Sequence, residues 1–356
     1  MNILRTKKYS KGLSLIELMI AMVIGLLLLL GTTSLFTNNK RIYKDQNEMG
    51  RLQENARFAT EMLIQDIRMA GYIGCSDDIG NLTNNFNTTV TNLASFTNLV
   101  EGSESAANWQ PSNSTEIVAN MAANSDGVTV RYLQPLDINL TGNSTATTAP
   151  INAVTDLQVN ELAAVTDCKA SDIFRITGVT GGPAPAAITN LTHAAITNTY
   201  NTDAEVARFV TVRYYVGPGT DIDGDGVGDP ALFRYVYAQD KDDDDGDGNT
   251  TEIIAHSEEL IEGVENMQIL YGEDTAGNDF VADTYVDAAT VANWANVVSV
   301  RIALLMRTIV EDFSTPLNTD TYNLLDVNNF DPTATDDHRR RRVFTFTIQI
   351  RNQATT

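Results

Sequence analysis

The sequence predicts an α+β protein, in which one long N-terminal helix packs on an antiparallel β-sheet head with large loops. Two observations lead to this fold. Apolar residues fill positions 13–36 almost without interruption, and a helical apolar pattern continues to about residue 69. After residue 206, β-rich segments alternate with turn and loop residues, which is typical of antiparallel strands.

The first part of the predicted helix, residues 13–36, is long enough to cross a bilayer, because such a helix spans about 36 Å. Beyond it, apolar residues recur every three or four positions and predict an amphipathic continuation: Met49, Leu52, Ala56, Ala59, Leu63, Ile67 and Ala70. Charged residues, Asp66 among them, lie between these positions. Gly71 and Gly74 predict the end of the helix.

A basic leader and one carboxylate mark the start of the apolar span. Residues 1–12 contain no acid and four basic residues, which are Arg5, Lys7, Lys8 and Lys11. Glu17 lies near the start of the span, where a carboxylate is costly in lipid and is by default functional. No Ala-x-Ala type cleavage site follows the span, so it should stay attached to the mature protein. An ordinary N-terminal anchor, the alternative, explains the apolar run but not Glu17.

The junction Lys11-Gly12-Leu13-Ser14-Leu15-Ile16-Glu17 resembles the class III signal of type IV prepilins. The resemblance implies that a prepilin peptidase cuts after Gly12 and methylates Leu13, where many family members have phenylalanine. It also implies that Glu17 pairs with the N-terminal amine of the neighbouring subunit during assembly.

Several further segments resemble PilW-type minor pilins, namely residues 66–75, 213–216, 262–272, 293–307 and 338–343. This resemblance implies a structural protein, not an enzyme, that helps initiate type IV pilus assembly. The implied partners are other minor pilins in a tip or priming complex, the major pilin through the N-terminal helix, and a tip adhesin. The implied location is the inner membrane of a Gram-negative bacterium, crossed once with the head in the periplasm, and then the pilus at or near its tip.

Two other classes of protein are alternatives. A J-type pseudopilin of a type II secretion system would share the leader, the helix and an acidic head, although residues 68–75 and 293–307 favour the pilus. An anchored periplasmic hydrolase would need a convergent catalytic set. The sequence has three histidines without metal-binding spacing, no Gly-rich phosphate loop and no nucleophile elbow.

These patterns divide the chain into five parts: the leader 1–12, the apolar assembly helix 13–36, its amphipathic continuation 37–74, a loop-rich part of the head 75–205, and a β-sheet part with acidic loops 206–356. In the loop-rich part, only residues 128–133 and the segment after Cys168 predict strands. The sheet part predicts a hairpin (208–216 and 231–237), a turn and strand (260–272), a short helix (287–296) and two more strands (297–306 and 343–350).

The formal net charge of -22 over 356 residues predicts a surface that repels bulk nucleic acid and attracts divalent cations. Four arginines, Arg339 to Arg342, precede the last predicted strand. Binding to phosphates needs a basic face rather than one short run, so we expect these arginines to pair with acids of the head and not with DNA.

The chain has two cysteines, Cys75 and Cys168. In an exported protein an isolated pair predicts one disulfide, and two buried thiols are the alternative.

Two acidic loops have the alternating carboxylates and glycines that suit a calcium ion. The candidate ligands of the first are Asp221, Asp223, Asp225, the carbonyl of Val227, and Asp229 directly or through water. Those of the second are Asp243, Asp245, Asp247 and Asn249. Both loops lack the bidentate glutamate of an EF-hand at the twelfth position. The alternative is a pair of solvated acidic hairpin loops without an ion.

Overall fold

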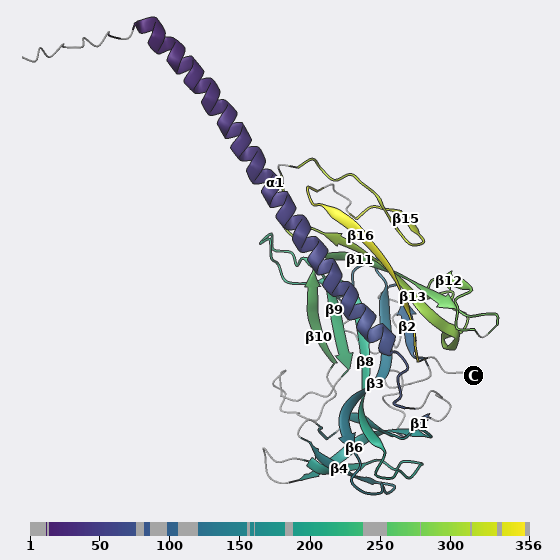
Figure 1. Cartoon of the computed structure of the whole chain (residues 1–356). Helices are drawn as coiled ribbons and strands as arrows, with labels where there is room; N and C mark the ends of the chain where they lie inside the picture. The colour runs from purple at the N-terminus through teal and green to yellow at the C-terminus, as the bar shows by residue number, and fades with distance from the viewer. Residues whose placement is uncertain are drawn as a thin grey trace, which may run out of the picture. The chain divides into compact units, whose positions relative to one another are not determined.

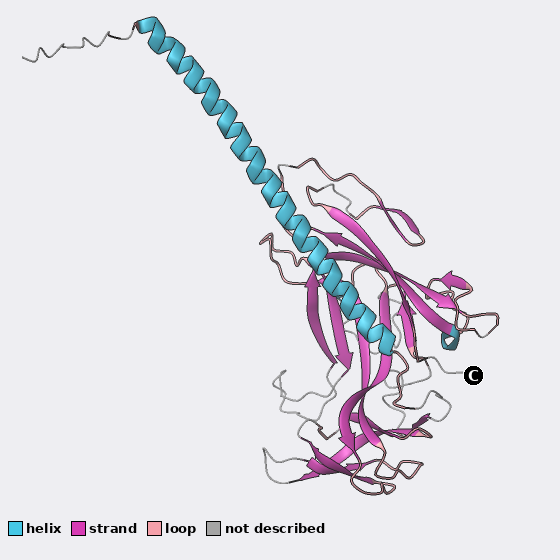
Figure 2. Cartoon of the chain, viewed as in Figure 1, coloured by secondary structure: helices cyan, strands magenta, loops and turns pink. Residues whose placement is uncertain are grey.

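A computed structural model describes the larger part of the chain. The described residues are 12, 14–75, 82–85, 98–105, 120–154, 157–159, 161–181, 188–237, 255–277, 279–313, 315–332 and 337–352. They form two compact units, residues 1–50 and residues 51–356. The fold is α+β, with one long helix and antiparallel sheets (Figure 2).

Helix α1 runs from Leu15 to Met69 without a break (Figure 1). Before Met49 its large apolar side chains are exposed, with Leu30 at 68% and Phe36 at 70%. From Arg51 onward the predicted apolar stripe is buried, with Ala59 and Leu63 both at 0% exposure. Helix α1 is long and apolar enough to cross a membrane. A signal sequence would meet the same criteria of length and composition.

The helix ends where the glycines predicted. Gly71 has φ +74°, which a residue with a side chain rarely adopts. A Cβ at this position would also lie 2.6 Å from the carbonyl oxygen of Asn352 and 2.6 Å from Leu99 Cδ1. Both the turn and the close packing therefore require glycine.

The larger sheet has ten strands. At its centre β8 (Glu205–Pro218) is antiparallel to β3 (Gly127–Asn139), β5 (Leu162–Thr166) and β9 (Pro230–Tyr237). The other strands are β1 (Leu82–Asn84), β2 (Val100–Ser103), β4 (Thr148–Val154), β6 (Ser171–Gly181), β7 (Ile188–His193) and β10 (Ala255–Glu262). The predicted hairpin of residues 208–216 and 231–237 is confirmed as β8 and β9.

The smaller sheet has four strands in the order β12 (Thr284–Val286), β11 (Val264–Glu273), β13 (Val297–Arg307) and β16 (Arg341–Gln349). A hairpin of β14 (Tyr322–Leu324) and β15 (Val327–Phe330) packs on this sheet, with Leu324 against Ala303 and Leu305. The short helix predicted at 287–296 is wrong, since the structure has a 3-10 turn there at Trp294–Asn296.

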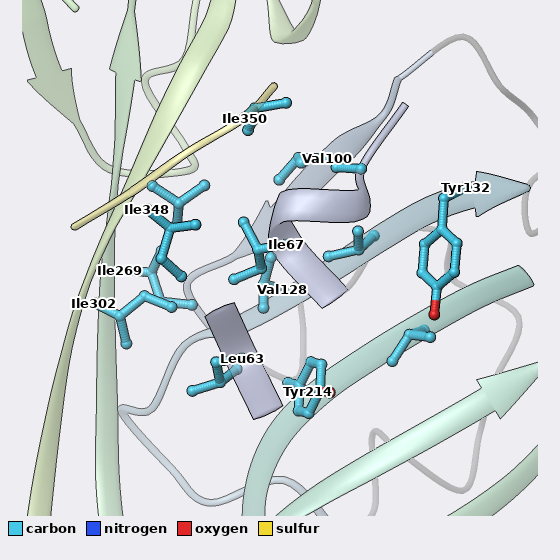
Figure 3. Packing of buried hydrophobic residues seen from close by; sticks show 14 of the residues in the cluster. Leu63, Ile67, Val100, Val128, Tyr132, Tyr214, Ile269, Ile302, Ile348 and Ile350 are labelled. Atoms are coloured by element: carbon cyan, nitrogen blue, oxygen red, sulfur yellow. The ribbon is translucent and has the colours of Figure 1, made fainter. Parts of the chain in front are cut away.

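The core lies between the end of α1 and both sheets. Figure 3 shows Leu63 and Ile67 of the helix with Val128 of the larger sheet and Ile269 and Ile302 of the smaller one. Alternate residues of β13 face this core, and the residues between them face the β14–β15 hairpin. The helix therefore buries its apolar stripe against two sheets at once.

The segment 75–205 contains more strands than the sequence predicts. Besides the two expected regions, the structure has β1, β2, β4, β5 and β7 there. All five residues of β5 are buried, so this strand has no apolar and polar alternation that could have revealed it. Leu162 and Ala164 pack in the main core, whereas Ala163 and Val165 pack in a second cluster with Phe174.

Asp66 is buried, although its position in the sequence groups it with the charged residues between the apolar positions of the helix. Its carboxylate accepts hydrogen bonds from Tyr132 Oη of β3 (3.0 Å), Tyr214 Oη of β8 (2.6 Å) and Arg234 Nε of β9 (3.0 Å). Burial and the neighbouring carboxylate raise the pKa of both tyrosines well above the ordinary range. One acid thus joins the helix to three strands.

The disulfide between Cys75 and Cys168 is confirmed. It links the chain just after α1 to the turn between β5 and β6, across a sequence separation of 93. Beside it, the hydroxyls of Thr166 and Ser171 donate to the carbonyl oxygen of Ile73. The end of the helix is therefore attached to the larger sheet by a covalent bond and two hydrogen bonds.

Asp126 joins the two sheets. Its backbone N–H donates to Met267 O (2.8 Å) of β11, and its Oδ2 accepts from Ile269 N (2.7 Å). Burial, with the nearby charge of Glu104, raises the pKa of Asp126 to about 8. The carboxyl group is therefore mostly neutral at pH 7, which lowers the cost of placing it between the sheets.

Candidate functional site

The N-terminal end of α1 is closed by a pair of reciprocal hydrogen bonds. The backbone N–H of Ser14 donates to Glu17 Oε2 (2.9 Å), and the backbone N–H of Glu17 donates to Ser14 Oγ (3.2 Å). This is a capping box, which satisfies two of the N–H groups that a helix leaves unpaired at its start. The sequence Ser-x-x-Glu could have revealed it.

The capping box fixes where the Glu17 carboxylate lies. The carboxylate is turned back toward the backbone of Ser14. Glu17 is exposed, as are its apolar neighbours Leu15, Ile16 and Leu18. A carboxylate at this end of a helix also interacts favourably with the helix dipole. Gly12 is exposed, whereas Leu13 and residues 1–11 lie outside the described residues, so the predicted cleavage and methylation remain predictions.

In the first acidic loop, the structure brings together Asp221, Asp223 and Asp225. One carboxylate oxygen of each lies within 4.8 Å of the others. The loop turns back on itself because Asp221 accepts from the N–H groups of Gly224 (2.7 Å) and Gly226 (2.9 Å). Both glycines have positive φ angles, which their missing side chains permit.

Two arginines approach the same loop. Arg339 Nη2 donates to Asp223 Oδ2 (2.6 Å), and Arg307 Nη2 donates to Asp229 Oδ1 (2.9 Å). The bond from Arg339 lowers the pKa of Asp223. Asp229 is 3% exposed, and its other oxygen accepts from Ile222 N. The cluster of carboxylates consists of Asp221, Asp223 and Asp225, and one of its members, Asp223, is paired with Arg339. Asp229 is not one of the three and is paired with Arg307.

The expected pairing of the arginine run with acids of the head is confirmed for two of its members. Arg339 pairs with Asp223, and Arg341 pairs with Glu265 (2.6 Å) and Asp337 (2.7 Å). The side chain of Arg341 is fully buried. These arginines hold loops of the head together. Their acidic partners are distant in the sequence, so the individual pairs could not be predicted from it.

The second predicted calcium loop lies outside the described residues. This applies to Asp243, Asp245, Asp247 and Asn249. Among the described residues, the only group of three acids, histidines or cysteines close enough to share a metal ion is the one at Asp221, Asp223 and Asp225.

Two family models match the chain. The prokaryotic N-terminal methylation motif matches residues 7–33, and the type IV pilus-assembly protein W (PilW) matches residues 213–352. The chain matches a PilW-family pilin with a prepilin-like N-terminus. No protein of curated function and no solved structure matches it.

The two matches cover the same two regions of the chain that carry most of its motifs. The methylation motif covers the Gly12–Leu13 junction, Glu17 and the start of α1, and the PilW match covers the chain from within β8 through β16. The segment 66–75, which also resembles PilW-type pilins, lies outside both matches. The matches support a minor pilin of the type IV pilus, and both families are pilin-type structural proteins.

Proposed function

We propose that this chain helps initiate type IV pilus assembly as a minor pilin, within a tip or priming complex formed with other minor pilins. The observation that carries the proposal is the N-terminal part of α1, where Glu17 is the single carboxylate of the exposed apolar residues 15–36, a stretch whose first part matches the methylation motif. An exposed surface of this kind is unfavourable in water, so it would lie in the membrane first and among other pilin helices afterwards.

In this proposal the prepilin peptidase cuts after Gly12 and methylates Leu13. Before assembly the helix anchors the protein in the inner membrane with the head in the periplasm. In the pilus, Glu17 of this chain pairs with the N-terminal amine of a neighbouring subunit. Pairing is required because each charge would be costly if it were buried alone. The remaining partners are the major pilin along the helix and a tip adhesin at the head.

Substitutions at Gly12 and Glu17 separate processing from assembly. We expect Gly12→Val to leave the leader attached and Leu13 unmethylated, as measured by intact mass and N-terminal sequencing of protein from membranes. We expect Glu17→Val to be cut and methylated but absent from sheared pili, with at least tenfold less protein recovered there than for wild type. Deletion of the protein should reduce surface pili.

Ser14→Ala is the matched control for Glu17, because it removes half of the capping box and keeps the carboxylate. Its pili should resemble wild type. If Ser14→Ala lost assembly as fully as Glu17→Val, Glu17 would act through helix capping alone. Loss of type II secretion with pili intact would instead support the pseudopilin alternative.

We also propose that the first acidic loop binds calcium weakly through Asp221, Asp223 and Asp225, with the carbonyl of Val227. Support comes from the convergence of the three carboxylates on a glycine-turned loop. With a dissociation constant of about 10⁻⁴ to 10⁻³ M, millimolar calcium would stabilise the head by roughly 1–2 kcal/mol.

We therefore expect 5 mM calcium to raise the melting temperature by about 2–6 °C relative to a chelator, for the full chain in detergent. Asp221→Asn should reduce this rise, and any residual rise would come from the second loop. Asp279→Asn, which changes an exposed acid of another loop, should keep it. Equal melting temperatures with calcium and with chelator would contradict the proposal.

A further inference from the structure

Strand β16 forms one edge of the smaller sheet (Figure 1). It has nine residues, and it pairs with β13 from Ser299↔Gln349 to Arg307↔Arg341 without a register shift. The last strand of the described chain is therefore a long and regular edge.

The pairing shows which backbone groups of β16 remain available. Beyond the two ends of the ladder, Ile350 N donates to Val298 O (2.9 Å) and Thr308 N donates to Arg340 O (2.9 Å). In an antiparallel pair, every second residue bonds to its partner strand. Even-numbered residues of β16 therefore bond to β13, whereas the N–H and C=O groups of Val343, Thr345 and Thr347 point away from it.

The other edge strands among the described residues are protected in ways that β16 is not. Five of them, β1, β2, β12, β14 and β15, have only three or four residues. β10 has a register shift between Glu259 and Ile261, and β4 contains Pro150 and a register shift after it. Short length, bulges and proline are the usual means of preventing a sheet edge from pairing with another chain. β16 has none of the three.

The side chains of β16 suit an extended partner. Phe344 and Phe346 lie on the same face as Arg342, because side chains alternate along a strand. Both phenylalanines are only partly buried against the main core. Arg342 is exposed, stacks over the ring of Phe344 (5.5 Å), and has no carboxylate partner within the described part of the chain. Its neighbours Arg339 and Arg341 are paired with acids, as described above.

We propose that the free edge of β16 binds an extended segment of another polypeptide chain by β-strand addition. Backbone hydrogen bonds to Val343, Thr345 and Thr347 would supply affinity, and alternate side chains would supply selectivity. The bound segment has apolar residues at alternate positions, on the side that lies next to Phe344 and Phe346. The following residue on that same side is acidic and lies beside Arg342. A second copy of this acidic chain is disfavoured, because its net charge of -22 opposes self-association.

Photocrosslinking in intact bacteria tests this proposal with the full chain. A benzophenone amino acid replaces Thr347 on the free edge or, as a control, the exposed Glu258 on β10. We expect the probe at 347, and not the one at 258, to crosslink to one segment of another chain. Mass spectrometry should show that this segment has an acidic residue followed or preceded by alternating apolar residues.

Thr345→Pro, with Thr345→Val as its matched control, decides whether backbone pairing is involved. Because the N–H of Thr345 points away from β13, proline removes no hydrogen bond of the sheet but blocks an added strand. We expect Thr345→Pro to reduce crosslinking from position 347 at least tenfold and Thr345→Val to keep it. Arg342→Glu should reduce it about fivefold. Melting temperatures of the proline and valine variants within about 3 °C of each other would show that the fold is intact.

Three outcomes would overturn the proposal. They are no crosslinked segment at position 347, a segment without the alternating pattern, or crosslinking that persists in folded Thr345→Pro. If Thr345→Pro does not fold, Thr347→Pro with the probe at position 345 repeats the test. Intact mass is measured in parallel, so a failure of processing at Gly12 can be told apart from a failure of β16 to bind.

Discussion

Asp66→Ala is expected to lower the melting temperature of the full chain in detergent by roughly 10 °C, which corresponds to a loss of about 3–5 kcal/mol. The substitution removes the shared acceptor of Tyr132, Tyr214 and Arg234. Both hydroxyls are buried, and the guanidinium has lost most of its exposure to water. Groups left without a partner in such places cost more than the interaction itself contributed.

Two variants test the cause of this loss. Asp66→Asn keeps an oxygen that can accept from the tyrosines but removes the charge that pairs with Arg234, so we expect a smaller decrease. Glu61→Ala, on the same helix, removes an exposed ion pair with Arg57 and should change stability by less than about 0.5 kcal/mol. A melting temperature for Asp66→Ala equal to that of Glu61→Ala would show that the network around Asp66 does not stabilise the head.

Replacing both Cys75 and Cys168 with serine is expected to destabilise the protein by about 4–5 kcal/mol and to lower its melting temperature by more than about 10 °C. The disulfide closes a loop with a sequence separation of 93. In the chain-entropy account, a loop of this length restricts the unfolded state strongly. The bond also fixes the end of α1 to the turn before β6.

Reduction supplies the control for this prediction. A reducing agent should lower the melting temperature of the wild type to about that of the double variant, and it should leave the double variant unchanged. A wild type whose melting temperature does not respond to reduction, with the thiols shown to be free by mass, would contradict the stabilising role of the bond.

Local patterns allowed the sequence to predict much of this chain. The helix follows from apolar periodicity, its end follows from Gly71 and Gly74, and the methylation motif follows from a few adjacent residues. The strands near the C-terminus were also predictable, because β13 and β16 are rich in apolar and β-branched residues. Two cysteines in a chain that the sequence predicts to be exported were enough to predict the disulfide.

Properties that depend on residues far apart in the chain were decided by the tertiary structure. β5 lacked a pattern because both of its faces are buried, one in the main core and the other in the second cluster. Asp66 shows the same limit of sequence-based prediction for a side chain. Its place in the helical pattern groups it with the other charged residues, and its hydrogen-bond partners come from β3, β8 and β9, which are distant in the sequence.

The sequence by itself thus determined that this chain has an apolar N-terminal helix, a prepilin-like junction and a β-rich acidic head. The tertiary structure decided which acids meet which arginines, how Asp66 is satisfied, and that β16 is the last strand of its sheet in the described part of the chain. The physical reason is that periodicity and short motifs act within a few residues, whereas ion pairs, buried hydrogen bonds and strand order depend on segments that only folding brings together.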